Sequence, residues 1–80
     1  MSPTVFRYKS YRFYFFSREE PRMHVHVSSG EGEAKIWLEP EIVLAEHYGL
    51  SLRELRDLQR IVEERRNDII HHWRDHFGPG

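Results

Sequence analysis

The chain has 80 residues, of which 39% are hydrophobic and 31% charged, and its net charge is −1 with the histidines neutral. A domain of this length buries only roughly 60% of its unfolded surface, so we expect a marginally stable domain that gains from a second copy or another protein partner. The chain lacks cysteine, which excludes disulfides and thiolate zinc sites, and no apolar run approaches the roughly 20 residues of a membrane span. We therefore expect a soluble, cytoplasmic protein without membrane contact.

Residues 4–16 predict a first β-hairpin, because most of them are aromatic or β-branched and Lys9-Ser10 lies at the centre of the segment. A turn there pairs Tyr8 with Tyr11, and the next pairs outward are Arg7 with Arg12, Phe6 with Phe13, and Val5 with Tyr14. One side of the hairpin is then an aromatic core surface made of Phe6, Tyr8, Tyr11, Phe13 and Phe15.

Residues 23–38 predict a second hairpin, joined to the first by the charged connector 17–22. Apolar residues alternate with His24 and His26 on its first strand, so the histidines share one face. If Val27 pairs with Ala34 across the glycine-containing loop, His24 lies opposite Trp37 and His26 lies opposite Lys35. The other face is then wholly apolar, with Met23, Val25, Val27, Ala34, Ile36 and Leu38.

Residues 42–47 contain four consecutive apolar residues, which periodicity alone cannot assign. We favour a short edge strand folded back by the turn 39–41, with a short helix as the alternative. A helix is expected to begin after Ser51, because Ser51 and Glu54 match the capping box. It extends to about His76 on the apolar stripe Leu55, Leu58, Val62, Ile69 and Trp73.

These elements predict an α+β fold in a single domain, residues 1–80. A small antiparallel meander sheet of four or five strands occupies about 3–48. One long C-terminal helix, about 52–76, covers one face of the sheet. A helix of some 25 residues is about 37 Å long, which exceeds the roughly 25–30 Å breadth expected of the domain, so part of it overhangs or bends.

The uncovered sheet face is the candidate site. His24 and His26 are placed to act as acid and base on an RNA 2′-hydroxyl and leaving oxygen, since imidazole titrates near neutrality. Lys35 or Arg12 would stabilise the phosphorane charge. These four residues are the candidate catalytic groups of a metal-independent ribonuclease. The candidate RNA-contacting residues are Arg7, Tyr14 and Trp37. The alternatives left open are half-exposed structural histidines and a metal held by the pair.

The helix offers weaker candidates. His72 and His76 have the i, i+4 spacing of a zinc pair, but no HExxH motif surrounds them, and we expect an exposed polar face without metal or cofactor. Arg65 and Arg66 interrupt the apolar stripe, and with Trp73 on the overhang they are candidates for binding a protein partner.

Five segments carry a family resemblance: Pro3-Thr4-Val5, Tyr11-Arg12-Phe13, Glu20 through Val27, Ala34 to Leu38, and Trp73 with Phe77. Together they resemble a widespread bacterial family of small proteins, domain of unknown function 4160. Here Arg22-Met23 stand where the family commonly has two prolines. Members are frequently encoded beside a second small protein, in a neighbourhood similar to a type II toxin-antitoxin operon. The resemblance implies a cytoplasmic toxin-like protein held by a protein partner.

Two hypotheses follow. In the first, the protein is a toxin-antitoxin component that binds or cleaves RNA through the uncovered sheet face. In the second, it is a non-enzymatic interaction module, such as the regulatory half of such a pair, which binds another protein through its long helix and edge strand.

Overall fold

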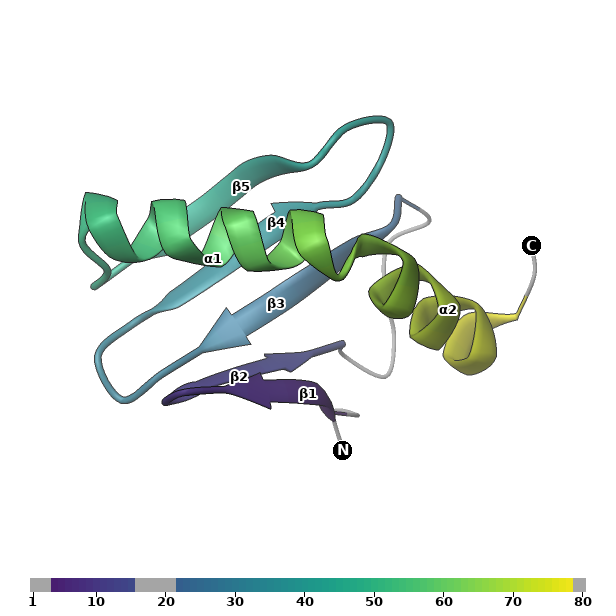
Figure 1. Cartoon of the computed structure of the whole chain (residues 1–80), viewed down its shortest axis with the longest axis horizontal. Coiled ribbons are helices and arrows are strands. Elements are labelled where there is room, and N and C mark those ends of the chain that lie inside the picture. The colour runs from purple at the N-terminus through teal and green to yellow at the C-terminus, as the bar shows by residue number, and fades with distance from the viewer. Residues whose placement is uncertain (1–3, 16–21, 79–80) are drawn as a thin grey trace.

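The structure, a computed structural model, describes residues 4–15 and 22–78. Five antiparallel strands follow one another in the order β1-β2-β3-β4-β5, and two helices complete the α+β fold (Figure 1). The strands are β1 Thr4–Tyr8, β2 Tyr11–Tyr14, β3 His24–Ser28, β4 Glu33–Trp37 and β5 Val43–Tyr48. The helices are α1 Leu52–Glu64 and α2 Arg66–Phe77. The predicted connector 17–22, apart from Arg22, lies outside the described residues.

Helix α1 lies across one face of the sheet, over β3 and β4 (Figure 1). It contributes four buried side chains, which meet the apolar positions of the central strands. The predicted alternation is confirmed, because the apolar residues of β3 and β4 are buried under the helix. The buried members of this core are Tyr11, Phe13, Phe15, Val25, Val27, Ala34, Ile36, Leu38, Leu55, Leu58, Ile61, Val62, Ile69 and Trp73.

The strand register confirms most of the predicted pairs. In the second hairpin, Val27 pairs with Ala34, as expected. In the first hairpin the three pairs nearest the turn are confirmed, but Tyr14 pairs with Thr4 and not with Val5. The register shifts between Thr4 and Phe6, because β1 contains one extra residue there. The order of apolar residues in the sequence does not reveal this irregularity.

The ambiguous segment 42–47 is a strand, β5, which begins at Val43 and ends at Tyr48. Its pairing with β4 also shifts, between Lys35 and Ile36. Because of that shift, Glu46 lies opposite Lys35 while Leu44 lies opposite Ile36. The end of β5 therefore carries side chains on the same sheet face as the histidines.

The prediction of one long helix is wrong, because the helix is divided at Arg65. The Arg65 backbone has φ −106° and ψ 17°, outside the α-helical region, although hydrogen bonds to neighbouring turns continue on both sides of it. A straight helix would extend past the edge of the sheet. The break instead turns α2 toward the end of the sheet where β3 begins (Figure 1). Ile69 and Trp73 of α2 are thereby buried.

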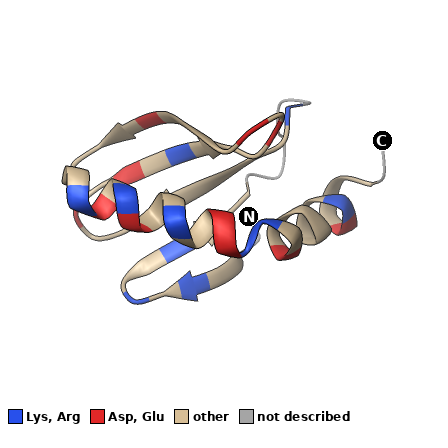
Figure 2. Cartoon of the chain, turned by 45° about the horizontal axis from the view of Figure 1, so that its top comes forward, with Lys and Arg blue, Asp and Glu red and all other residues tan. Residues whose placement is uncertain are grey.

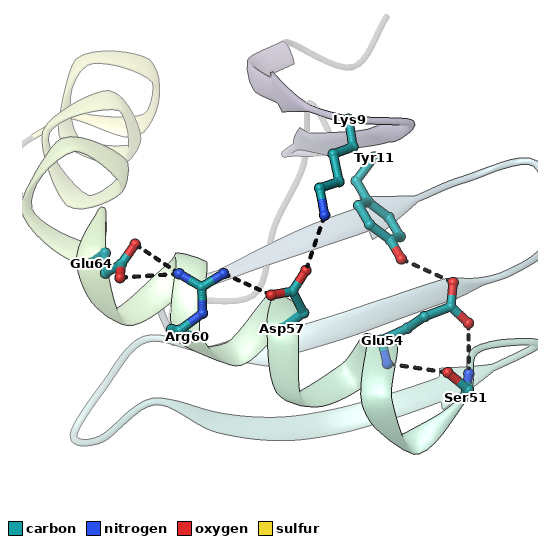
Figure 3. Close-up of polar contacts among 7 residues, drawn as sticks. All are labelled: Lys9, Tyr11, Ser51, Glu54, Asp57, Arg60 and Glu64. Atoms are coloured by element: carbon teal, nitrogen blue, oxygen red, sulfur yellow. Dashed lines mark hydrogen bonds and ion pairs between the residues drawn. The ribbon is translucent and has the colours of Figure 1, made fainter.

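The start of α1 has the predicted capping box (Figure 3). The Ser51 hydroxyl accepts a hydrogen bond from the Glu54 backbone N–H, and the Glu54 carboxylate accepts one from the Ser51 N–H. The same carboxylate accepts a hydrogen bond of 2.9 Å from the Tyr11 hydroxyl of β2. One glutamate therefore caps the helix and ties it to the sheet.

Two glycines allow the loop after β3 to lie against the end of β5. A Cβ on Gly32 would overlap the Tyr48 carbonyl oxygen. A Cβ on Gly49, whose φ is +72°, would likewise overlap the Glu31 carbonyl oxygen. Only a residue without a side chain fits this approach.

We expect Gly32→Ala to lower the free energy of unfolding by about 2 kcal/mol or more, because the backbone of Tyr48 and Gly49 must move to accept the methyl group. Gly30→Ala is the matched control, since nothing lies within 4 Å of a Cβ there. Urea denaturation of both variants checks this. Equal stability of the two variants would contradict the described approach of the loops.

Titration of the Tyr11 hydroxyl should report its burial and its hydrogen bond to Glu54. Burial, followed by its hydrogen bond to Glu54, raises the pKa of Tyr11 to about 12. The folded state thus holds this proton more tightly than the unfolded chain, in which tyrosine has a pKa of about 10. The resulting stabilisation is complete below about pH 10 and is lost as the pH rises toward about 12. We expect the late phenolate absorbance step to disappear in Tyr11→Phe, while the other steps remain.

Candidate functional site

The sheet face turned away from α1, here called the second face, brings the predicted site residues together. His24 pairs with Trp37 and His26 pairs with Lys35, as predicted from the sequence. Strand β2 adds its own residues to this face, because Tyr14 pairs with His26. The second face consists of Arg12, Tyr14, His24, His26, Lys35 and Trp37.

His24 is buried, with 1% of its surface exposed. Its ring centroid lies 5.3 Å from that of Trp37 and 5.4 Å from that of Trp73. Trp73 also packs against Phe15 of the core side, so α2 closes the end of the sheet and covers His24. The ring was expected to face water, and the cause of its burial is the helix break that brings Trp73 over it.

A hydrogen bond fixes the His24 ring. Its Nδ1 lies 2.7 Å from the backbone carbonyl oxygen of Arg22. A carbonyl oxygen only accepts, so Nδ1 carries a proton and donates it to this hydrogen bond. This arrangement orients the ring and suits a positioning residue better than a group that contacts substrate.

His26 is half-buried and stacks on Tyr14, with ring centroids 5.5 Å apart. It lines a hollow of about 170 Å³ between β3, β4 and β5. The polar side chains around this hollow are His26, Glu33, Lys35, Glu46, His47 and Tyr48. Of the predicted catalytic residues, the hollow therefore brings His26 and Lys35 together and leaves His24 and Arg12 outside it.

Cations lie over the aromatic rings of the second face. The Arg12 guanidinium is 4.7 Å from the Tyr14 ring centroid. Trp37 has two such neighbours, Arg22 at 4.1 Å and the Lys35 ammonium at 4.4 Å. Such contacts hold positive charges close to the sheet surface, where they attract anions.

Sequence reasoning missed Glu46 and Tyr48 of β5. Tyr48 is 64% exposed and borders the hollow, and the carboxylate of Glu33, by its charge and then by a hydrogen bond, raises the pKa of Tyr48. Glu46 lies 4.0 Å from the Lys35 ammonium. The alternation of β5 is the signal that could have found both residues, but it is broken by the register shift in the middle of the strand.

The remaining candidates are dispersed. Arg7 is exposed opposite Arg12, and Tyr14 is buried with 7% of its surface exposed. The Arg65 guanidinium lies 4.7 Å from the Phe6 ring, and Trp73 is buried within its own chain. Arg66, at the first position of α2, is half-buried.

Neither a metal cluster nor a membrane helix is found among residues 4–15 and 22–78. No group of three or more His, Asp or Glu side chains there is arranged to hold a metal ion. On α2, the His71 Nε2 atom lies 3.4 Å from an Asp75 carboxylate oxygen, in an exposed pair. In the same part of the chain no helix is long and apolar enough to cross a bilayer.

A family model described as Domain of unknown function (DUF4160) matches residues 10–74. The chain belongs to this family. The DUF4160 match includes every residue of the second face, the hollow beside it, all of α1 and most of α2. No curated protein and no solved structure matches the chain.

Stability measurements should separate the two histidines of the second face. We expect His24→Ala to lower the free energy of unfolding by about 3 kcal/mol, because it leaves a cavity beneath Trp73. His26→Ala should cost about 1 kcal/mol, since His26 is only half-buried. Urea denaturation measures both, and equal losses would contradict the burial of His24 under α2.

Proposed function

We propose that the protein binds single-stranded RNA on its second face, as the RNA-binding member of a toxin-antitoxin-like pair. The observation that carries this proposal is the hollow in which His26 and Lys35 lie beside the exposed ring of Tyr48. Single-stranded nucleic acids are held by cations that contact phosphates and by aromatic rings on which bases stack. The hollow and its surroundings offer both.

Each group has a role that follows from its chemistry. The exposed Tyr48 ring provides a surface for one base. The Lys35 ammonium donates to acceptors on a base edge, whereas the carboxylates of Glu33 and Glu46 accept from amino and imino groups. Arg12 and Arg22 border the same face and supply charge for the neighbouring phosphates.

Burial of His24 favours binding over cleavage. Two-histidine cleavage requires both rings within hydrogen-bond reach of the reacting oxygens. His24 is 1% exposed and its Nδ1 donates to the backbone carbonyl of Arg22, so this role is supported for His26 only. The family resemblance adds the setting of this proposal, a cytoplasmic protein held by a partner encoded nearby.

RNA affinity should depend on Tyr48. We expect Tyr48→Ala to weaken binding of a labelled oligouridylate about five- to 150-fold, because one stacked base contributes about 1–3 kcal/mol. Leu52→Ala is the matched control, since Leu52 is also 64% exposed but belongs to α1. Fluorescence anisotropy measures the affinity, and gel analysis of the same mixtures reports cleavage.

The proposal fails if wild-type protein does not bind the oligouridylate at physiological salt, or if Tyr48→Ala binds as well as Leu52→Ala. Cleavage that persists in His24→Ala and disappears in His26→Ala would instead identify a ribonuclease that uses a single histidine.

The edge strand favours a second candidate, a non-enzymatic interaction module. Among the described strands β5 pairs only with β4, and its Val43 and Tyr48 side chains are 44% and 64% exposed. A partner protein could add a strand to this edge and cover these residues. In that case Tyr48→Ala weakens association with the protein encoded nearby and leaves RNA affinity unchanged.

A further inference from the structure

A second hollow, of about 630 Å³, lies between α1 and the turn that joins β1 to β2. It is distinct from the hollow of the second face, because its walls are one side of α1 and the hairpin turn. Basic residues occur both along α1 and on the β1–β2 hairpin beside it (Figure 2). Four cations and two carboxylates line this hollow, which leaves an excess of two positive charges in a chain whose net charge is −1.

The two carboxylates are engaged within the protein (Figure 3). Glu54 caps α1 and accepts from Tyr11. Asp57 lies 2.7 Å from the Arg60 guanidinium and 4.0 Å from the Lys9 ammonium. The hydrogen bond from Arg60 holds the pKa of Asp57 below its usual value, so the carboxylate stays ionised and balances one cation.

Two arginines give the hollow its unbalanced charge. Arg53 and Arg56 are exposed and lie three residues apart on α1, hence on neighbouring positions of one helix face. Among residues 4–15 and 22–78, the ion pairs of this surface join Lys9, Asp57, Arg60 and Glu64. The guanidinium groups of Arg53 and Arg56 thus border the hollow as donors available to an incoming anion.

Lys9 has a backbone conformation that glycine would adopt more easily. Its φ is +54°, and it is the one non-glycine residue with a positive φ in the described part of the chain. Side chains other than glycine, asparagine and aspartate are disfavoured there. Lysine at this position extends its ammonium group over the hollow toward Asp57 (Figure 3). A two-residue turn such as Lys9-Ser10 favours a positive φ at a central residue, and this turn carries the Lys9 ammonium to the charged hollow.

From these observations we infer that the hollow between α1 and the β1–β2 turn binds phosphate groups, through Lys9, Arg53 and Arg56. The identification of their source as the backbone of a bound RNA strand rests on the proposed function. A backbone phosphate carries its charge on two non-bridging oxygens, and a terminal phosphate carries it on three, so either can accept from donors on both walls of the hollow. An excess of two positive charges also matches two successive backbone phosphates.

The test uses tripolyphosphate and an oligouridylate as separate probes of the full-length protein. We expect Arg56→Gln and Lys9→Gly each to weaken tripolyphosphate binding about tenfold or more at low salt, since each removes a charge-assisted contact. Arg74→Gln is the control, an exposed arginine of α2 with the same charge change. Lys9→Gly should fold at least as well as the wild-type protein, because glycine relieves the positive φ.

With the oligouridylate, the slope of log affinity against log salt should fall by about 0.7 in Arg56→Gln and stay unchanged in Arg74→Gln, as expected for the loss of one phosphate contact. If RNA affinity depends on Tyr48, but Arg56→Gln matches Arg74→Gln both in salt slope and in tripolyphosphate binding, the inference is overturned and the proposed function stands. Tripolyphosphate binding that requires Arg56, in a protein that does not bind RNA, supports the hollow, rejects the proposed function and leaves a free phosphate compound as the source.

Two further results would overturn the inference. One is the absence of tripolyphosphate binding by the wild-type protein at low salt. The other is a glutamate-rich peptide that binds more tightly than tripolyphosphate and loses affinity in Arg56→Gln, which would assign the hollow to an acidic protein partner.

Discussion

Packing of α1 against β3 and β4 is the interaction on which the rest of the structure depends. It buries Leu55, Leu58 and Val62 against the apolar positions of the sheet, and the shared carboxylate of Glu54 fixes the helix start on the hairpin. Because successive strand residues point to opposite sides, covering one face assigns every histidine, lysine and tryptophan of β3 and β4 to the other. The chemistry of the second face is thus a consequence of where the helix binds.

The second face combines a rigid part with an accessible part. His24 belongs to the rigid part, since Trp37, Trp73 and a backbone carbonyl surround its ring. Tyr48 belongs to the accessible part, at the border of the small hollow. The side chains of His26 and Lys35, which lie between them, are half-buried. A surface of this kind is suited to hold a ligand in a defined orientation, because the contacts that face solvent are supported by packed and hydrogen-bonded groups.

Sequence reasoning succeeded where the structure follows from local periodicity and failed where it depends on how elements meet. Alternation gave the pairs of His24 and His26, and the capping box gave the start of α1. No glycine or proline near Arg65 predicts the helix break. The break arises because a straight helix would be too long for the sheet. Burial of His24 depends on that break, and Tyr48 was missed because an extra residue in β5 interrupts the alternation.

The division of the helix at Arg65 gives the domain two levels of stability. Helix α2 is joined to α1 through one non-helical residue and reaches the sheet through Ile69 and Trp73. Its detachment as a unit requires less free energy than global unfolding, because the main core under α1 stays intact. Such partial opening would bring the His24 ring into water while the strand pairing of its backbone persisted. The buried imidazole is therefore protected by a helix that Ile69 and Trp73 hold against the sheet.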